Sequence, residues 1–117
     1  MKLYEIKKIL KAVVLVGEDQ LEKTITGGGG ADLMEDVLAA AAEGAVLLTG
    51  LTSDQVIRTA KIADVGAVVF VRGKKPAESA VKLARSYNIP ILLTDFSLFI
   101  ASGRLYMDGL RGLNGSW

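Results

Sequence analysis

Residues able to bind an anion follow three short apolar runs in this sequence. The runs cover residues 45–48, 67–71 and 89–93. The hydroxyl and basic side chains that come after them are Thr49, Thr52, Arg72, Lys74 and Thr94. Hydroxyls donate hydrogen bonds to phosphate or carboxylate oxygens, and arginine and lysine add full positive charges. This set is suited to binding an anionic small molecule or nucleotide, and it contains no evident reactive group.

A run of four glycines, Gly27, Gly28, Gly29 and Gly30, is the second candidate ligand-binding segment. Each residue in such a run loses much conformational freedom on folding, so the run needs a reason. Three reasons stay open from the sequence. A ligand or another backbone approaches closely there, the segment is a mobile hinge, or it is a dimer contact.

Simpler roles exist for the same side chains. Thr52, Ser53 and Thr94 are in positions typical of helix N-caps. Arg72, Lys74 and Lys75 can form an ordinary solvated loop, since short basic clusters are common on protein surfaces.

No catalytic or cofactor-binding motif is found in the sequence. The chain has no histidine and no cysteine, which removes the usual general base, the thiol nucleophile and thiolate metal sites. The glycine run lacks the sixth-position glycine of a dinucleotide fingerprint, and Gly73-Lys74 is followed by Lys75 rather than the Ser or Thr of a P-loop. We expect no catalytic residue, no metal and no cofactor.

An acidic cluster at residues 32–36 is the remaining candidate for chemistry. Acids are favoured at helix starts, so a structural role for Asp32, Glu35 and Asp36 is preferred over a metal or acid-base role. A small transferase or hydrolase using Asp32 and Lys74 is kept as a third alternative.

Composition narrows the classes of partner. With 14 basic and 13 acidic side chains the 117-residue chain has almost no net charge, so we expect no nucleic-acid partner. Lysines interrupt the N-terminal apolar residues, and no stretch approaches the roughly 20 residues needed to span a bilayer. We expect a cytoplasmic protein without membrane association. The domain organisation expected is one α/β domain over residues 1–107 and a Gly-rich C-terminal tail over residues 108–117.

A repeated pattern predicts the elements that position these residues. Gly44, Gly66 and Asn88 are 22 residues apart, and each precedes one of the apolar runs and follows a helical pattern. This order is typical of parallel strands covered on both faces. The fold class predicted is three-layer α/β/α, with a mainly parallel sheet of about four to five strands.

The remaining elements are predicted from periodicity and capping residues. Residues 12–16 are predicted as a buried strand and residues 21–26 as a weaker extended segment. Helices are expected over residues 2–10, 32–43, 53–64 and from Pro76, in the first helical turn, to Tyr87, with a short closing helix near 96–100 capped by Thr94 or Asp95. The second helix is expected to begin with a capping box of Asp32 and Glu35, and its inward stripe to be Leu33, Met34, Val37, Leu38 and Ala41.

The parallel arrangement predicts where a ligand would bind. Loops that follow parallel strands collect at one edge of the sheet, which is the usual ligand edge of open α/β folds. We therefore expect Thr49, Arg72 and Thr94 to share an edge. The glycine run joins them if residues 21–26 form a further parallel strand.

The chain resembles the DRTGG domain family in three segments, residues 30–39, 45–50 and 89–95. The resemblance implies a small α/β module of a kind that accompanies CBS domains in regulated pyrophosphatases and occurs in some phosphate acetyltransferases. Such modules are also similar to the N-terminal domain of HPr kinase, without its kinase domain. The Asp-Arg signature of the family would fall at 29–32, where this chain has Gly29, Gly30, Ala31 and Asp32. No arginine role can be carried over there.

Two functions follow as expectations. The first is a non-catalytic regulatory module that senses an anionic metabolite or nucleotide and acts through a homodimer or a partner enzyme. The second is an assembly module without a small ligand, which buries apolar surface from the region of Phe96, Phe99, Leu105, Tyr106 and Met107.

Overall fold

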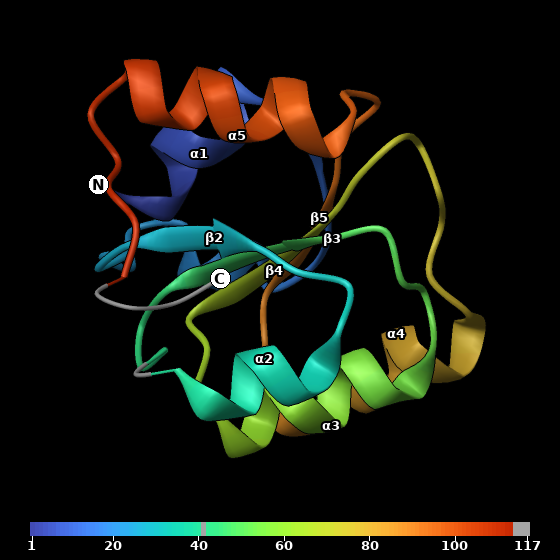
Figure 1. Cartoon of the computed structure of the whole chain (residues 1–117). Helices are drawn as coiled ribbons and strands as arrows, with labels where there is room; N and C mark the ends of the chain where they lie inside the picture. Colours follow the sequence, from blue (N-terminus) through green and yellow to red (C-terminus); the bar gives the residue numbers. More distant parts are fainter. Residues whose placement is uncertain (41, 114–117) are drawn as a thin grey trace.

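A five-stranded sheet lies between two layers of helices (Figure 1), with the strand order β1-β5-β4-β3-β2. The structure is a computed structural model, and it describes residues 1–40 and 42–113. The strands are β1 Val13–Val16, β2 Gly28–Gly30, β3 Val46–Thr49, β4 Ala67–Phe70 and β5 Ile91–Leu93. All neighbouring pairs are parallel except β1 with β5, which is antiparallel. The predicted three-layer fold with a mainly parallel sheet is confirmed.

Helices cover both faces of the sheet (Figure 1). One layer contains α1 Leu3–Ile9 and α5 Leu98–Met107, and the other contains α2 Met34–Ala39, α3 Asp54–Ile62 and α4 Glu78–Tyr87. A short 3-10 helix, η1 Glu18–Gln20, follows β1. None of the helices in residues 1–40 and 42–113 is long and apolar enough to cross a membrane.

The central strands are apolar on both faces because helices cover both. In β3, Val46 and Leu48 pack with α1 and α5, while Leu47 packs with the opposite layer. All three side chains are almost fully buried. This alternation divides the core into two clusters, one on each side of the sheet, as a period of two residues requires.

Gly44, Gly66 and Asn88, the three equally spaced residues that precede the apolar runs, have different structural roles. Gly44 and Asn88 take left-handed conformations, with φ of +75° and +59°, which end a segment and turn the chain into the next strand. Gly66 does not have a positive φ, and the turn after α3 is made by Asp64 at φ +56°. The predicted third helix, residues 53–64, therefore ends earlier than expected, and Gly66 is required for another reason, close packing against the Gly44 carbonyl.

The N-terminal strands differ from the prediction. The β1 strand pairs on one side only and is half-exposed, so it is an edge strand rather than a buried one. Residues 21–26 form no strand, and Thr24 makes only an isolated bridge to Lys2. The glycine run, which was expected to be a loop after such a strand, itself supplies β2. Glycine has low strand propensity, so the sequence pattern gave no sign of this strand.

Helix boundaries also required correction. The helix expected over residues 32–43 covers only Met34–Ala39. Leu33 and Leu38 are 55% and 48% exposed, so they do not belong to its buried stripe. Ala41, the last member of that stripe, lies outside the described residues.

The last two helices begin later than predicted. Pro76 precedes the N-cap of α4, Ala77, instead of lying in the first turn. The closing helix α5 has 10 residues, and its N-cap is Ser97, whose Oγ accepts a hydrogen bond from the Ile100 amide, rather than Thr94 or Asp95.

The beginning of the C-terminal segment packs beside β2. Leu110 is buried, the Gly28 amide donates to the Arg111 carbonyl at 3.0 Å, and Gly112 forms a parallel bridge with Gly28. Residues 114–117 of the predicted tail lie outside the described residues. The described part of this segment therefore covers one end of an edge strand that would otherwise expose its backbone.

The left-handed residue at the end of α4 gives a first prediction. Asn88→Ala is expected to lower the free energy of unfolding by about 1 kcal/mol. Alanine is disfavoured at positive φ, whereas the short polar side chain of asparagine tolerates it. Asn88→Gly is the control and should be close to neutral, although it loses the exposed contact from Gln20 Nε2 to Asn88 Oδ1. Urea unfolding of the three proteins measures the difference, and equal losses for both variants would contradict the conformational explanation.

Candidate functional site

Three neighbouring parallel strands end level with one another and form one rim of the sheet. Thr49 is in register with Phe70, and Phe70 is in register with Leu93. The loops that follow are also joined, since the Val71 amide donates to the Thr49 carbonyl at 3.1 Å and the Gly73 amide to the Thr94 carbonyl at 2.9 Å. The expectation that Thr49, Arg72 and Thr94 share an edge is confirmed.

The threonine side chains at this rim face opposite sides of the sheet. Thr49 Oγ1 donates to Asp32 Oδ1 at 3.0 Å, while Thr94 Oγ1 donates to the Leu10 carbonyl at 2.7 Å. Both residues are fully buried or nearly so. Thr52 is half-buried, and its carbonyl accepts a hydrogen bond from the Ala77 amide. The threonines thus hold the loops in place through contacts within the chain.

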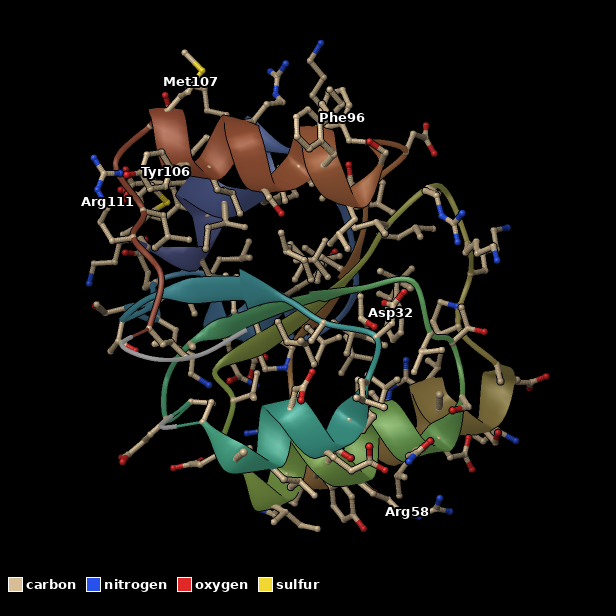
Figure 2. All side chains as sticks on the ribbon, in the orientation of Figure 1. Asp32, Arg58, Phe96, Tyr106, Met107 and Arg111 are labelled. Carbon is tan, nitrogen blue, oxygen red and sulfur yellow. The ribbon has the colours of Figure 1, made fainter. Side chains whose placement is uncertain are left out.

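Asp32 joins two loops of the rim. Its Oδ1 accepts hydrogen bonds from Thr49 Oγ1 and from the Gly50 amide, the latter at 2.8 Å. The capping box predicted for Asp32 and Glu35 is wrong, because the N-cap of α2 is Leu33 and has no side-chain cap. Asp32 instead ties the end of β2 to the loop after β3 (Figure 2). Both of these hydrogen bonds use Oδ1, so Oδ2 takes part in neither.

A hollow of about 320 Å³ opens at this rim. We call it the rim hollow, and it is lined by Asp32, Gly50, Val71, Arg72, Ser97, Leu98 and Phe99. It combines one positive side chain, one carboxylate, one hydroxyl and an apolar wall. Phe99 is 84% exposed and therefore stands at the mouth of the hollow rather than in the core.

The backbone places Arg72 over the hollow. Arg72 and Gly73 both have positive φ, +60° and +64°, which turns the chain sharply after β4. The Arg72 amide donates to the Phe96 carbonyl at 2.8 Å, so this turn is fastened to the loop before α5.

Gly50 leaves room beneath the two charged groups. A Cβ on Gly50 would lie 3.4 Å from Arg72 Nη2 and 3.5 Å from Asp32 Oδ2. Lys74 and Lys75 are exposed further along the same loop and do not line the hollow.

The glycine run lies on a separate hollow. Gly28, Gly29 and Gly30 line a second space of about 310 Å³, the glycine hollow, together with residues of α5 and the C-terminal segment. A Cβ would lie 2.8 Å from Leu110 Cδ2 at Gly28 and 2.7 Å from Leu98 Cδ1 at Gly30. Close approach by other parts of the chain thus accounts for these two glycines. Of the nine predicted ligand residues, Arg72 lines the rim hollow and Gly28, Gly29 and Gly30 line the glycine hollow. The other five, Gly27, Thr49, Thr52, Lys74 and Thr94, line neither.

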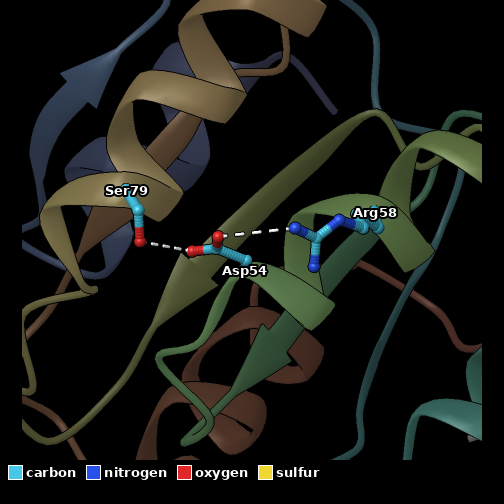
Figure 3. Close-up of polar contacts among 3 residues, drawn as sticks. All are labelled: Asp54, Arg58 and Ser79. Atoms are coloured by element: carbon cyan, nitrogen blue, oxygen red, sulfur yellow. Dashed lines mark hydrogen bonds and ion pairs between the residues drawn. The ribbon is translucent and has the colours of Figure 1, made fainter.

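The neighbouring helix N-termini are tied together by a carboxylate. Asp54, in the first turn of α3, accepts a hydrogen bond from Ser79 Oγ of α4 at 2.6 Å and lies 3.5 Å from Arg58 Nη2 (Figure 3). The carboxylate already supplies negative charge at the positive end of the α3 dipole. An external anion has less reason to bind there, which leaves Arg72 as the main cationic feature lining the rim hollow.

Of the seven residues that line the rim hollow, only Arg72 was among the ligand-binding residues predicted from the sequence. Asp32 was interpreted as a helix cap, because β2 was not recognised and the rim position of its following loop was hidden. Leu98 and Phe99 were assigned to a short closing helix, and Ser97 was placed in the loop after the last strand but not among the ligand-binding residues. A usable signal existed for Ser97, since serine followed by a long apolar-rich segment is a typical N-cap.

Comparison with known proteins places the chain in context. The DRTGG domain matches residues 5–106. The structure is similar to the CBS and DRTGG domains of the regulatory region of Clostridium perfringens pyrophosphatase, determined in complex with the activator diadenosine tetraphosphate, with a TM-score of 0.73 and 18% identity. The match covers 97% of this chain and 51% of that one, so this chain spans about half the length of its structural relative. At this identity the likeness shows a common fold. No curated protein matches in sequence.

Proposed function

Because this chain belongs to the DRTGG domain family, we propose that it is a non-catalytic regulatory module that senses an anionic nucleotide at the rim hollow and acts through a homodimer or a partner enzyme. The observation that carries this proposal is the rim hollow itself. Its side chains match the separate parts of a nucleotide.

Each part of the ligand has a matching group. The Arg72 guanidinium binds phosphate oxygens through paired N–H donors, and Lys74 on the same loop meets a phosphate chain that extends out of the hollow. The apolar wall of Leu98 and Phe99 offers a face on which a base stacks. Asp32 Oδ2 accepts hydrogen bonds from ribose hydroxyls, while Oδ1 keeps the loops joined.

The other predicted residues support the site indirectly in this proposal. Thr49 and Thr94 fix the loops from opposite faces of the sheet, and Thr52 holds the loop after β3 against α4. Of Gly27 to Gly30, Gly30 lets the chain of β2 lie close to Leu98, which lines the rim hollow, while Gly27 and Gly28 let it lie close to Leu113 and Leu110. The structural relative gives a further reason to test adenine nucleotides, since its regulatory region binds diadenosine tetraphosphate as an activator.

Calorimetric titration tests the proposal. Diadenosine tetraphosphate, ATP and ADP are titrated into the chain and into Arg72→Ala. Loss of a charge-assisted hydrogen bond pair should raise the dissociation constant at least about tenfold, which corresponds to about 1.4 kcal/mol. Phe99→Ala should also weaken binding, by roughly the 1–3 kcal/mol of a stacked base.

A matched control distinguishes loss of a contact in the rim hollow from a general effect of lowering the net charge. Arg85→Ala removes an exposed arginine in the last turn of α4, the helix that leads into β5 from the far end of the sheet. Its affinity should equal that of the unaltered chain. If none of the ligands binds at millimolar concentration, or if Arg72→Ala and Arg85→Ala weaken binding equally, the proposed site is wrong.

A second candidate function is assembly without a ligand. It is favoured by exposed apolar side chains on α5, where Phe99, Tyr106 and Met107 are 84%, 59% and 87% exposed. Tyr106 and Met107 are labelled in Figure 2. Two residues expected in this surface are less available. Leu105 is buried in its own chain, and the ring of Phe96 is partly covered by the Arg104 guanidinium at 4.6 Å.

A further inference from the structure

Helix α5 is apolar on two opposite faces. Ala101 and Leu105 face the sheet and are buried. The outward face presents a stripe of exposed residues, which we call the α5 stripe: Phe99, Ile100, Gly103, Tyr106 and Met107. A helix that is apolar all round is normally buried, and a contiguous apolar patch on a surface marks an interaction site. The five residues of the α5 stripe are uncharged, and aromatic residues and Met are the types enriched at interface cores. The exposed Arg104 borders the stripe, and its Nε donates to the Ile9 carbonyl of α1 at 3.1 Å.

The α5 stripe is symmetric about its central glycine. Ile100 and Tyr106 are each three residues from Gly103, and Phe99 and Met107 are each four residues from it. Residues three and four apart share one helix face, so the pattern is the same in both directions along the helix. A surface with this property complements itself under a two-fold rotation, which makes Phe99 face Met107 and Ile100 face Tyr106 across an antiparallel helix pair.

The glycine at the centre permits close contact. A Cβ on Gly103 would meet no atom within 4 Å, so the centre of the stripe is open. Glycine in a helix interior is unfavourable by about 0.5–1 kcal/mol relative to alanine, and the fold gives no internal reason for it. Small residues at a helix crossing let two helix axes approach closely, which supplies such a reason.

A positive charge lies beside one end of the stripe. Arg111 is held beside the stripe, with its guanidinium 4.1 Å from the centre of the Tyr106 ring. In the antiparallel pair, this arginine lies near the N-terminal end of the partner's α5, and the helix dipoles oppose each other favourably.

We propose that a second copy of this chain docks on the α5 stripe, with the two α5 helices antiparallel and Gly103 on the two-fold axis. The inference rests on the homodimer in the proposed function and specifies its surface. It also links the surface to the site, because Phe99 belongs to both the α5 stripe and the rim hollow, and Tyr106 lines the glycine hollow. The partner copy therefore lies against the mouths of both hollows, so ligand binding and dimerisation affect each other reciprocally.

Disulfide trapping tests the geometry without any ligand. The chain has no cysteine, so Gly103→Cys introduces a single thiol on the proposed axis. Two such residues facing each other at a close helix crossing are within the Cα separation that a disulfide needs. Mild oxidation should convert most of this variant to a covalent dimer. Ile62→Cys, at a 74% exposed isoleucine on α3, is the control and should stay mainly monomeric under the same conditions.

Sedimentation equilibrium tests the surface independently. Phe99→Glu combined with Met107→Glu should raise the dimer dissociation constant at least tenfold, whereas Ile62→Glu should leave it unchanged. All three side chains are largely exposed, so the variants should fold. Circular dichroism checks that they do. An unaltered chain that is monomeric at high micromolar concentration overturns both this inference and the homodimer. A dimer that resists the Phe99/Met107 change, or that Gly103→Cys does not trap, overturns the α5 geometry alone. Nucleotide binding is measured separately, so its failure affects only the ligand proposal.

Discussion

Replacing Ile57 by alanine should destabilise the fold more than most single changes, by about 2–5 kcal/mol. Ile57 is completely buried in the cluster between α3 and the sheet, so the truncated side chain leaves a cavity as well as losing apolar contact. The total stability of such a domain is only about 5–15 kcal/mol, so the loss is a large fraction of it. Chemical unfolding monitored by circular dichroism measures the change.

The same helix provides the control for this prediction. Ile62 is 74% exposed near the end of α3, and Ile62→Ala should change the free energy of unfolding by no more than about 0.5 kcal/mol. Both changes remove the same atoms from the same helix, so only burial differs between them. Similar losses in the two variants would show that α3 does not face the sheet as described.

The second large effect is expected at Gly66. A Cβ at this position would lie 2.8 Å from the Gly44 carbonyl oxygen and 2.9 Å from its carbon, closer than real Cβ contacts. These atoms are backbone and cannot rotate away, so Gly66→Ala should cost about 1–3 kcal/mol, toward the upper end of the range for overpacking. Thermal or urea unfolding would measure it.

Gly112→Ala is the matched control for Gly66. The nearest atom to its Cβ would be the Gly28 carbonyl oxygen at 3.7 Å, an ordinary contact, and neither glycine has a positive φ. The control variant should be as stable as the unaltered chain or slightly more stable, because alanine restricts the unfolded chain. If Gly66→Ala were equally well tolerated, β3 and β4 would not begin as close together as the structure shows.

Elements with strong local signals could be predicted from the sequence. The three apolar runs are strands β3, β4 and β5, since a strand buried on both faces is apolar at every position. Their common direction followed from the helices between them, which predicts that Thr49, Arg72 and Thr94 share one rim. Asn88 was recognisable as a helix stop because asparagine tolerates left-handed φ.

Features that depend on tertiary contact could not be predicted. The β2 strand consists of glycine, whose presence is explained by Leu98 and Leu110, more than 65 residues away in sequence. Without β2, the position of Asp32 beside Gly50 was hidden, and its acid-rich surroundings favoured the wrong assignment as a helix cap. Thr94 could be placed at the rim, but only its pairing with the Leu10 carbonyl shows that its hydroxyl faces α1.

The position of the two hollows changes how a ligand would act. Five of the nine predicted ligand residues line neither hollow, whereas Arg72 lines the rim hollow and Gly28, Gly29 and Gly30 line the glycine hollow. The α5 helix contributes to both. If the proposed dimer forms, a ligand that contacts Phe99 would shift its population through the difference in ligand affinity between the monomer and the dimer.

An NMR titration of the isotope-labelled chain with diadenosine tetraphosphate tests the central claim, that the rim hollow is the ligand site, most directly. The amides of Gly50 and Gly73, which lie in the rim loops, should shift progressively with added nucleotide. Gly17, which packs against Pro90 at the opposite end of the sheet, should not shift. No shift at millimolar nucleotide, or shifts centred on Gly17 rather than on Gly50, would contradict the account.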